Sequence, residues 1–120
     1  MGKALEFEVL NKDYLVASVR FDYKEQKLHI ENNGKHFMDV AVLDKVSTLD
    51  ELNDWFEGRC FLRSRADKDF LLTALGLTEY APYNIVRKTN GVLFEDTYWI
   101  RFEDQPNLTW ADVDPRRVEE

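Results

Sequence analysis

Hydrophobic and polar residues alternate along the first third of the chain. In "ALEFEVL" (4–10) the large apolar side chains fall on one side of an extended backbone and the two glutamates on the other, which is typical of a half-buried β-strand. The segment "YLVASVRFDY" (14–23) is rich in β-branched and aromatic residues, and "KLHIE" (27–31) alternates again. Short polar turns separate the three segments, so the pattern predicts an antiparallel β-meander.

Two further strands are predicted beyond these three. "NNG" (32–34) suits a hairpin turn because Asn and Gly tolerate positive φ, and "KHFMDVAVL" (35–43) then returns as a fourth strand. A late strand is predicted over "TYWIRF" (97–102). We expect it to join the sheet beside the first hairpin.

The alternation of the late strand predicts which of its side chains are buried. Tyr98, Ile100 and Phe102 are expected to face the core, whereas Trp99 is expected on the other face of the strand and partly exposed. Trp110, farther along the chain, is expected to cover one end of the core.

The period changes to that of a helix in the middle of the chain. "STLDELNDWFEGR" (47–59) opens with a capping-box spacing and carries apolar residues at intervals of three and four. A second helix is predicted in "ADKDFLLTALGL" (66–77), and a third, with a proline near its start and Asn-Gly at its end, in "APYNIVRKTNG" (81–91). "TWAD" (109–112) predicts a capped final turn. The apolar face expected for the second helix consists of Phe70, Leu71, Ala74 and Leu75.

This order of elements predicts an α+β fold. It consists of an N-terminal antiparallel β-meander of three to four strands, two to three short helices and one late strand that joins the sheet. With 120 residues, of which 44% are hydrophobic, the chain is long enough for one core and is expected to form a single domain over residues 1–120.

The net charge of −7 disfavours binding to polyanions, because phosphate binding needs clustered Lys and Arg. Direct binding to nucleic acid or to a membrane is therefore not expected. The surplus of acids either keeps a small domain soluble or presents carboxylates to a basic surface of a partner. No apolar stretch approaches the length of roughly 18 residues that crosses a bilayer, and a cytoplasmic location is expected.

No sequence motif of a catalytic or metal site stands out. The chain lacks G-x-S-x-G, a phosphate-binding glycine loop and H-E-x-x-H. His29 and His36 have no spacing that would bring them to one metal ion, and neither a base nor an orienting group can be placed beside Cys60, the single cysteine. We therefore expect no enzyme, no catalytic residue, no metal site and no cofactor.

Three arginines gather after the first predicted helix: Arg59, Arg63 and Arg65 lie within seven residues. Guanidinium groups bind carboxylates or phosphates through paired hydrogen bonds, so this loop could bind an anion or a partner. Alternatively, the arginines pair with acids of the same chain. We expect internal pairing, with Arg59 bound to a nearby acid at the junction of helix and loop and Arg63 freer to meet a partner.

Several short motifs occur in the order found in the N-terminal accessory segment of HipA-like kinases of Firmicutes and their mobile elements, which this chain resembles. They are a Trp-containing helix, a loop with two arginines, a helix end of the form Leu-Gly-Leu, a Tyr-Trp-Ile strand and a closing Trp-x-Asp-Val turn. The matching residues are Trp55, Arg59, Arg65, Leu75, Gly76, Leu77, Asp96, Tyr98, Trp99, Ile100, Trp110, Ala111, Asp112 and Val113.

The resemblance implies an accessory, antitoxin-like segment without the kinase body, since no ATP-binding or catalytic segment follows these motifs. The predicted function is a non-enzymatic module that binds a larger protein, such as a HipA-like kinase, and regulates or inhibits it in a mobile-element or phage context. The alternative is an acidic inhibitor of the anti-CRISPR type, which blocks the nucleic-acid channel of a nuclease with its carboxylates. The oligomeric state is left open.

The predicted partner-binding surface centres on the acidic face of the first helix. An aromatic anchor and one arginine are expected beside it, because buried aromatic residues supply interface energy and charges at the rim set selectivity. The candidate residues are Asp50, Glu51, Asp54, Glu57, Arg63 and Trp99.

Overall fold

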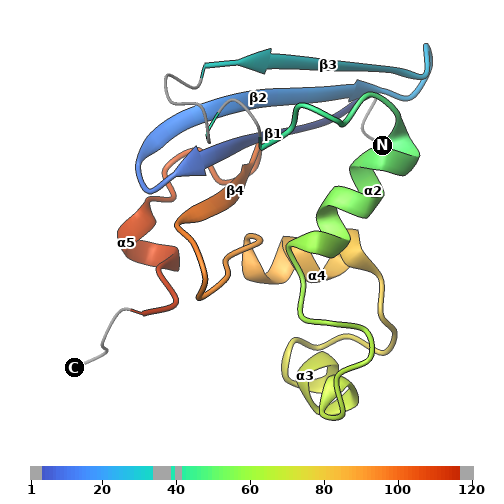
Figure 1. Cartoon of the computed structure of the whole chain (residues 1–120), viewed down its shortest axis with the longest axis vertical. Helices are drawn as coiled ribbons and strands as arrows, with labels where there is room; N and C mark the ends of the chain where they lie inside the picture. Colours follow the sequence, from blue (N-terminus) through green and yellow to red (C-terminus); the bar gives the residue numbers. More distant parts are fainter. Residues whose placement is uncertain (1–3, 34–38, 40–41, 117–120) are drawn as a thin grey trace.

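The computed structural model describes residues 4–33, 39 and 42–116. Its centre is a four-stranded antiparallel sheet in the order β3-β2-β1-β4 (Figure 1). The strands are β1 (Ala4–Asn11), β2 (Tyr14–Asp22), β3 (Lys27–Asn32) and β4 (Tyr98–Phe102). The late strand β4 pairs with β1, so both the meander and the position of the late strand beside the first hairpin are confirmed. The fold is α+β, as the order of the sequence patterns predicts.

The strand predicted over 35–43 is not confirmed. Residues 34–38, 40 and 41 lie outside the described residues, and so does part of the predicted 32–34 turn. Asp39, Val42 and Leu43, which the structure describes, are not in a strand. Leu43 is buried in the core instead, and the carbonyl of Val42 accepts a hydrogen bond from the indole of Trp55 at 3.1 Å. Val42 therefore contacts the helix predicted over 47–59, and Leu43 enters the core, both without strand pairing.

Three of the four helices that the structure describes start or stop at the capping residues that the sequence predicts. They are α2 (Leu49–Gly58), α3 (Lys68–Ala74), α4 (Pro82–Thr89) and α5 (Trp110–Val113). Thr48 caps α2 by accepting a hydrogen bond from the Glu51 N–H at 3.2 Å. Asn90 ends α4 in the left-handed conformation, with φ of 58°. A capping box joins Thr109 and Asp112 at the start of α5.

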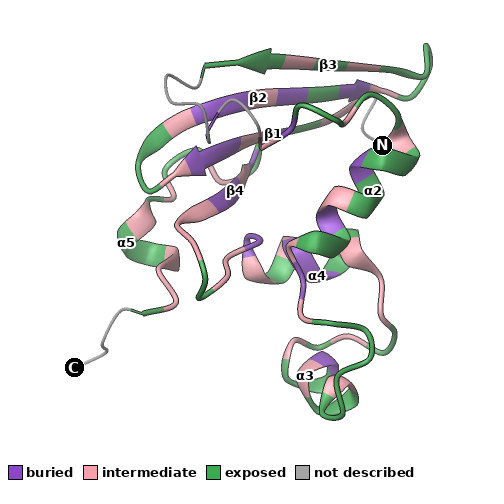
Figure 2. Ribbon diagram, in the orientation of Figure 1, coloured by how far each residue is buried: buried purple, intermediate pink, exposed green. Residues whose placement is uncertain are grey.

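Helices α2 and α4 cover one face of the sheet, and the main core lies between them and the strands (Figures 1 and 2). Phe7 stands at its centre, with ring centroids 6.3 Å from Trp55, 5.3 Å from Phe56 and 6.0 Å from Phe102. Tyr98, Ile100 and Phe102 contribute to this core, as predicted. Its buried members are Phe7, Val9, Val16, Ala17, Val19, Leu43, Leu52, Phe56, Cys60, Leu72, Ile85, Val86, Ile100 and Phe102.

The face predicted for the second helix is wrong in part. Phe70 is 74% exposed and Ala74 is also exposed, whereas Leu72 is buried. The run Phe-Leu-Leu offers three consecutive apolar residues, so periodicity alone cannot choose among them. Helix α3 is only seven residues long and lies away from the sheet, so Leu72 is its one buried side chain (Figure 1). Leu75, at the end of the helix, packs partly buried against the core, as predicted.

Trp99 is fully buried, so the prediction that it lies partly exposed is wrong. It does occupy the opposite face of β4 from Ile100, next to its register partner Leu10, which is buried too. The chain after β4 turns back over this face, where Arg101 donates a hydrogen bond to the carbonyl of Leu108. The indole N–H of Trp99 donates to the carbonyl of Lys12 at 2.6 Å, so the buried ring leaves no polar atom unsatisfied.

Trp110 is half-buried beside the turn between β1 and β2, and its backbone N–H donates to Asp13 at 2.9 Å. It therefore stands at the turn of the first hairpin and not over the core between sheet and helices, where we expected it.

Replacing Ile100 with Ala should destabilise the protein by roughly 2–5 kcal/mol, because the side chain is fully buried and its loss leaves a cavity. The free energy of unfolding can be measured by urea denaturation. Leu62→Ala is the matched control, since Leu62 is 73% exposed and its truncation should change stability by no more than about 0.5 kcal/mol. Equal effects of the two substitutions would contradict the assignment of Ile100 to the core.

Candidate functional site

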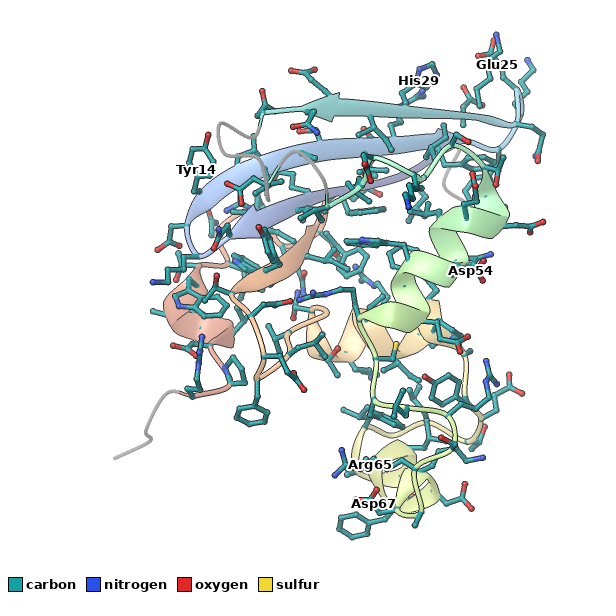
Figure 3. All side chains as sticks on the ribbon, viewed as in Figure 1. Tyr14, Glu25, His29, Asp54, Arg65 and Asp67 are labelled. Atoms are coloured by element: carbon teal, nitrogen blue, oxygen red, sulfur yellow. The ribbon has the colours of Figure 1, made fainter. Side chains whose placement is uncertain are left out.

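The four acids predicted on α2 are exposed, but they are not equivalent. The carboxylate of Glu51 accepts hydrogen bonds from the backbone N–H of Ser47 at 3.0 Å and from its hydroxyl at 2.8 Å, and these bonds lower its pKa. It therefore serves the start of the helix. Asp54 points outward from α2 (Figure 3), and among the described residues neither Asp50 nor Asp54 forms an ion pair.

Arg59, at the end of α2, is the most heavily bonded side chain of the arginine loop. Its guanidinium binds both carboxylate oxygens of Asp96, at 2.8 and 2.9 Å. It also donates to the carbonyl of Gly91 at 2.9 Å and to that of Tyr98 at 2.7 Å. The predicted pairing of Arg59 with an acid is confirmed, although the acid lies 37 residues along the chain and not in the adjoining segment.

The other two arginines also pair within the chain. Arg63 contacts Glu57 at 3.1 Å, and its guanidinium carbon lies 4.3 Å from the centre of the Tyr80 ring. Arg65 contacts Asp67 at 2.6 Å, beside α3 (Figure 3). Both arginine side chains remain 55% exposed, so each pair is a surface contact that a partner could remodel. Arg63 is thus freer than Arg59, as predicted, but it is not without a partner.

A shallow hollow of about 320 Å³ lies over the end of α2. Asp54, Glu57, Arg63 and Tyr80 line it. The exposed side chain of Leu62 also borders this hollow. Of the residues predicted for partner binding, Asp54, Glu57 and Arg63 therefore come together here, whereas Trp99 is buried and cannot be an exposed anchor.

A larger and mainly apolar groove of about 650 Å³ opens on the other side of Leu62. Its walls come from the α2–α3 loop, from α3 and α4, and from the segment 91–97, which we call the Phe94 loop. Leu62 and Phe94 are 73% and 68% exposed, respectively, and stand at the surface of the groove. The apolar residues of its lining are Cys60, Phe61, Leu62, Leu71, Ile85, Val92, Leu93 and Phe94.

The Phe94 loop is held at both ends. Asn90 precedes it, and the Asn90 side-chain amide donates to the carbonyl of Ile100 at 2.9 Å. Gly91 opens it with φ of 65°, and a side chain there would meet Ile100 at 2.9 Å, so this position needs glycine. Arg59 then binds Gly91 at one end of the loop and Asp96 at the other. This fixed backbone holds Phe94 at the surface.

Sequence patterns gave no signal for this groove. Leu62 and Phe94 lie in loops, where periodicity says nothing about burial, and the walls of the groove come from segments up to 37 positions apart. Exposed large apolar residues are informative in a folded protein, and their exposure is visible only in the structure.

The thiol of Cys60 lines the groove. Burial, and to a smaller extent the nearby Glu57 carboxylate, raise the pKa of the Cys60 thiol to about 12. The thiol instead contacts the Phe56 carbonyl at 3.2 Å. His29 is exposed on β3, at a distance from the groove along the fold, and His36 lies outside the described residues.

The described part of the chain comprises residues 4–33, 39 and 42–116. No three side chains among His, Cys, Asp and Glu gather there as a metal site would require. None of the helices there has the length and apolar character needed to cross a bilayer.

Comparisons with protein-family models, with curated proteins and with solved structures returned no significant match. The resemblance to the accessory segment of HipA-like kinases therefore depends on the short motifs alone. Within those motifs, Arg59 and Asp96 are joined in the structure by a bidentate ion pair, and Trp110 and Asp112 belong to α5.

Arg59→Ala should cost about 2–4 kcal/mol of stability, because it leaves a partly buried carboxylate and two carbonyls without their donor. Arg63→Ala, the matched control, should cost no more than about 1 kcal/mol, since its ion pair and ring contact are exposed. Urea denaturation of both variants compares them directly. A larger loss for Arg63→Ala would reverse the roles of the two arginines.

The same ion pair predicts a dependence of stability on acid. Desolvation raises the pKa of Asp96, but the Arg59 guanidinium and the Tyr98 N–H outweigh it and hold this pKa below its ordinary value. The stabilisation is present above the pKa of an unfolded aspartate, about 3.9, and is lost as the pH falls through the lower folded-state pKa.

The loss of stability on acidification below about pH 4 should therefore be shallower in Asp96→Asn than in the native protein, because the Asn side chain does not titrate. Denaturation midpoints measured in a series of buffers from about pH 2 to about pH 7, on both sides of that pKa, test this. Asp50→Asn is the control, because Asp50 forms no ion pair among the described residues. Identical slopes for Asp96→Asn and the native chain would contradict the role of the pair.

Proposed function

We propose that this chain is a non-enzymatic interaction module that binds a larger protein and regulates or inhibits it. The observation that carries the proposal is the surface around Leu62, where the apolar groove adjoins the acidic end of α2. A rigid apolar site with charged groups at its rim is the usual composition of a protein-binding surface.

The chemistry of this surface indicates what the partner presents. The groove would take an apolar side chain, and the exposed Phe94 and Leu62 would be buried on contact. Asp54 and Glu57 line the hollow that Leu62 borders, and Glu95 lines the groove. A segment with an apolar anchor between basic residues complements this arrangement.

A HipA-like kinase is the proposed partner class, because the motifs shared with the accessory segment of such kinases include the Arg59–Asp96 pair that shapes the groove. The anti-CRISPR type of inhibitor is the second proposal, and the net charge of −7 supports it. Its weakness is that Glu51 and Glu57 are engaged within the chain, so fewer carboxylates stand ready to replace phosphates. We propose a cytoplasmic location and no cofactor for either function.

Leu62→Asp combined with Phe94→Asp should abolish capture of the partner, because it places two carboxylates where apolar contact is expected. The measurement is affinity capture from the native host followed by mass spectrometry, with circular dichroism to verify folding. Phe70→Asp is the matched control: Phe70 is 74% exposed and does not line the groove. Partners retained by Phe70→Asp and lost from the double variant would support the proposal, and equal retention by both would overturn it.

The charged rim is tested separately. Asp50→Lys with Asp54→Lys should weaken capture by a basic partner, and the native interaction should weaken as salt screens it. Binding that is unaffected by both treatments would confine the interface to the apolar groove.

A further inference from the structure

The outer edge of β3 carries hydrogen-bonding groups that no described residue uses. β3 is the last strand on its side of the sheet. The Asn33 N–H donates to the carbonyl of Val16 at 2.7 Å, and the β2–β3 register places these two residues opposite each other. Because bonded and non-bonded pairs alternate in an antiparallel ladder, His29 bonds inward to β2, while the N–H and C=O of Leu28 and Ile30 point outward.

The side chains along this edge complement themselves. A two-fold axis through His29, perpendicular to the sheet, sets Lys27 of one copy against Glu31 of the other, and Leu28 against Ile30. Each of these pairs occurs twice because the axis repeats it. Cross-strand partners lie on the same face of a sheet, and both pairs obey this rule. Leu28 and Ile30 are also the residues whose backbone groups point outward, so the apolar pair coincides with a hydrogen-bonded pair.

The exposure of these residues fits a missing partner. Lys27, His29 and Glu31 are exposed, and Figure 3 shows His29 pointing away from the helices. Within the described residues neither Lys27 nor Glu31 forms an ion pair. Leu28 and Ile30 pack against the core but are only half-buried. A second strand would cover them and would neutralise both charges.

Neighbouring registers do not give the same fit. An axis through Ile30 sets Leu28 against Asn32 and Lys27 against Asn33, which loses the Lys27–Glu31 pairs and leaves one Ile30–Ile30 contact in place of two apolar pairs. An axis through Leu28 sets Glu25 of one copy against Glu31 of the other, a like-charge contact. Charges on edge strands commonly prevent pairing, but here their order favours one antiparallel register.

We propose that a second copy of this chain pairs antiparallel along β3, with the two-fold axis at His29, so that two sheets join into one. This interface uses the edge opposite β4 and leaves the apolar groove open. It is independent of the proposed function.

Charge exchange between copies tests the register. Sedimentation equilibrium should show a reversible dimer for the native chain. Lys27→Glu and Glu31→Lys should each raise the dimer dissociation constant at least about tenfold, because each turns two attractive pairs into repulsive ones. The variant carrying both changes should recover the native constant, and an equimolar mixture of the two single variants should form a heterodimer visible by native mass spectrometry.

Two controls keep the test specific. Glu79→Lys alters the net charge as Glu31→Lys does, at an exposed position in the connection to α4, and should leave dimerisation unchanged. Amide hydrogen exchange at Leu28 and Ile30 should slow as the native protein is concentrated. A native chain that stays monomeric at about 1 mM would overturn the proposal. A dimer whose dissociation constant is unchanged by the charge substitutions would also overturn the proposal, and so would a dimer in which the Leu28 and Ile30 amides exchange as fast as in the monomer.

Discussion

The guanidinium of Arg59 connects segments of this fold that are not joined by the hydrogen bonds of the sheet. It stands at the end of α2, is only 11% exposed, and bonds to Gly91, Asp96 and Tyr98. Hydrogen bonds to an ionised group are stronger than neutral ones, and the planar fork of arginine can satisfy several acceptors from one position. A single side chain thereby ties the first long helix to the Phe94 loop and to the start of β4, and it lines the groove. Folding of the core and shaping of the groove depend on the same contact.

The elements that local chemistry encodes were predictable. Alternation gives β1, β2, β3 and β4, and the caps at Thr48, Pro82, Asn90 and Thr109 bound the helices. Trp99 shows where this reasoning stops. Its face of the strand follows from alternation, but its burial depends on the chain after β4 returning over that face. The acid that pairs with Arg59 likewise lies 37 residues away. Tertiary contacts of this kind produce no periodic pattern in the sequence.

Part of the candidate site could be predicted from the sequence, and the part that could not consists of exposed apolar residues. Asp54, Glu57 and Arg63 were predicted because charge is visible in a sequence, and they do meet at one hollow. Leu62 and Phe94 could not be predicted, because a sequence does not distinguish an exposed apolar residue in a loop from a buried one. Exposed apolar area opposes solubility unless a partner covers it, and an acidic surface offsets that cost in the free chain.

The sheet separates the two surfaces that this chain offers. β3 forms one edge, whereas α2, α4 and the Phe94 loop lie toward the other side of the fold (Figure 1). Pairing along β3 would thus leave both grooves of a dimer accessible. Two linked sites bind a partner that carries two matching segments far more tightly than one site does, provided the geometry lets both engage. A dimeric partner would meet this condition through its own two-fold axis. The edge strand would then act on affinity without touching the partner, by setting the separation of the grooves.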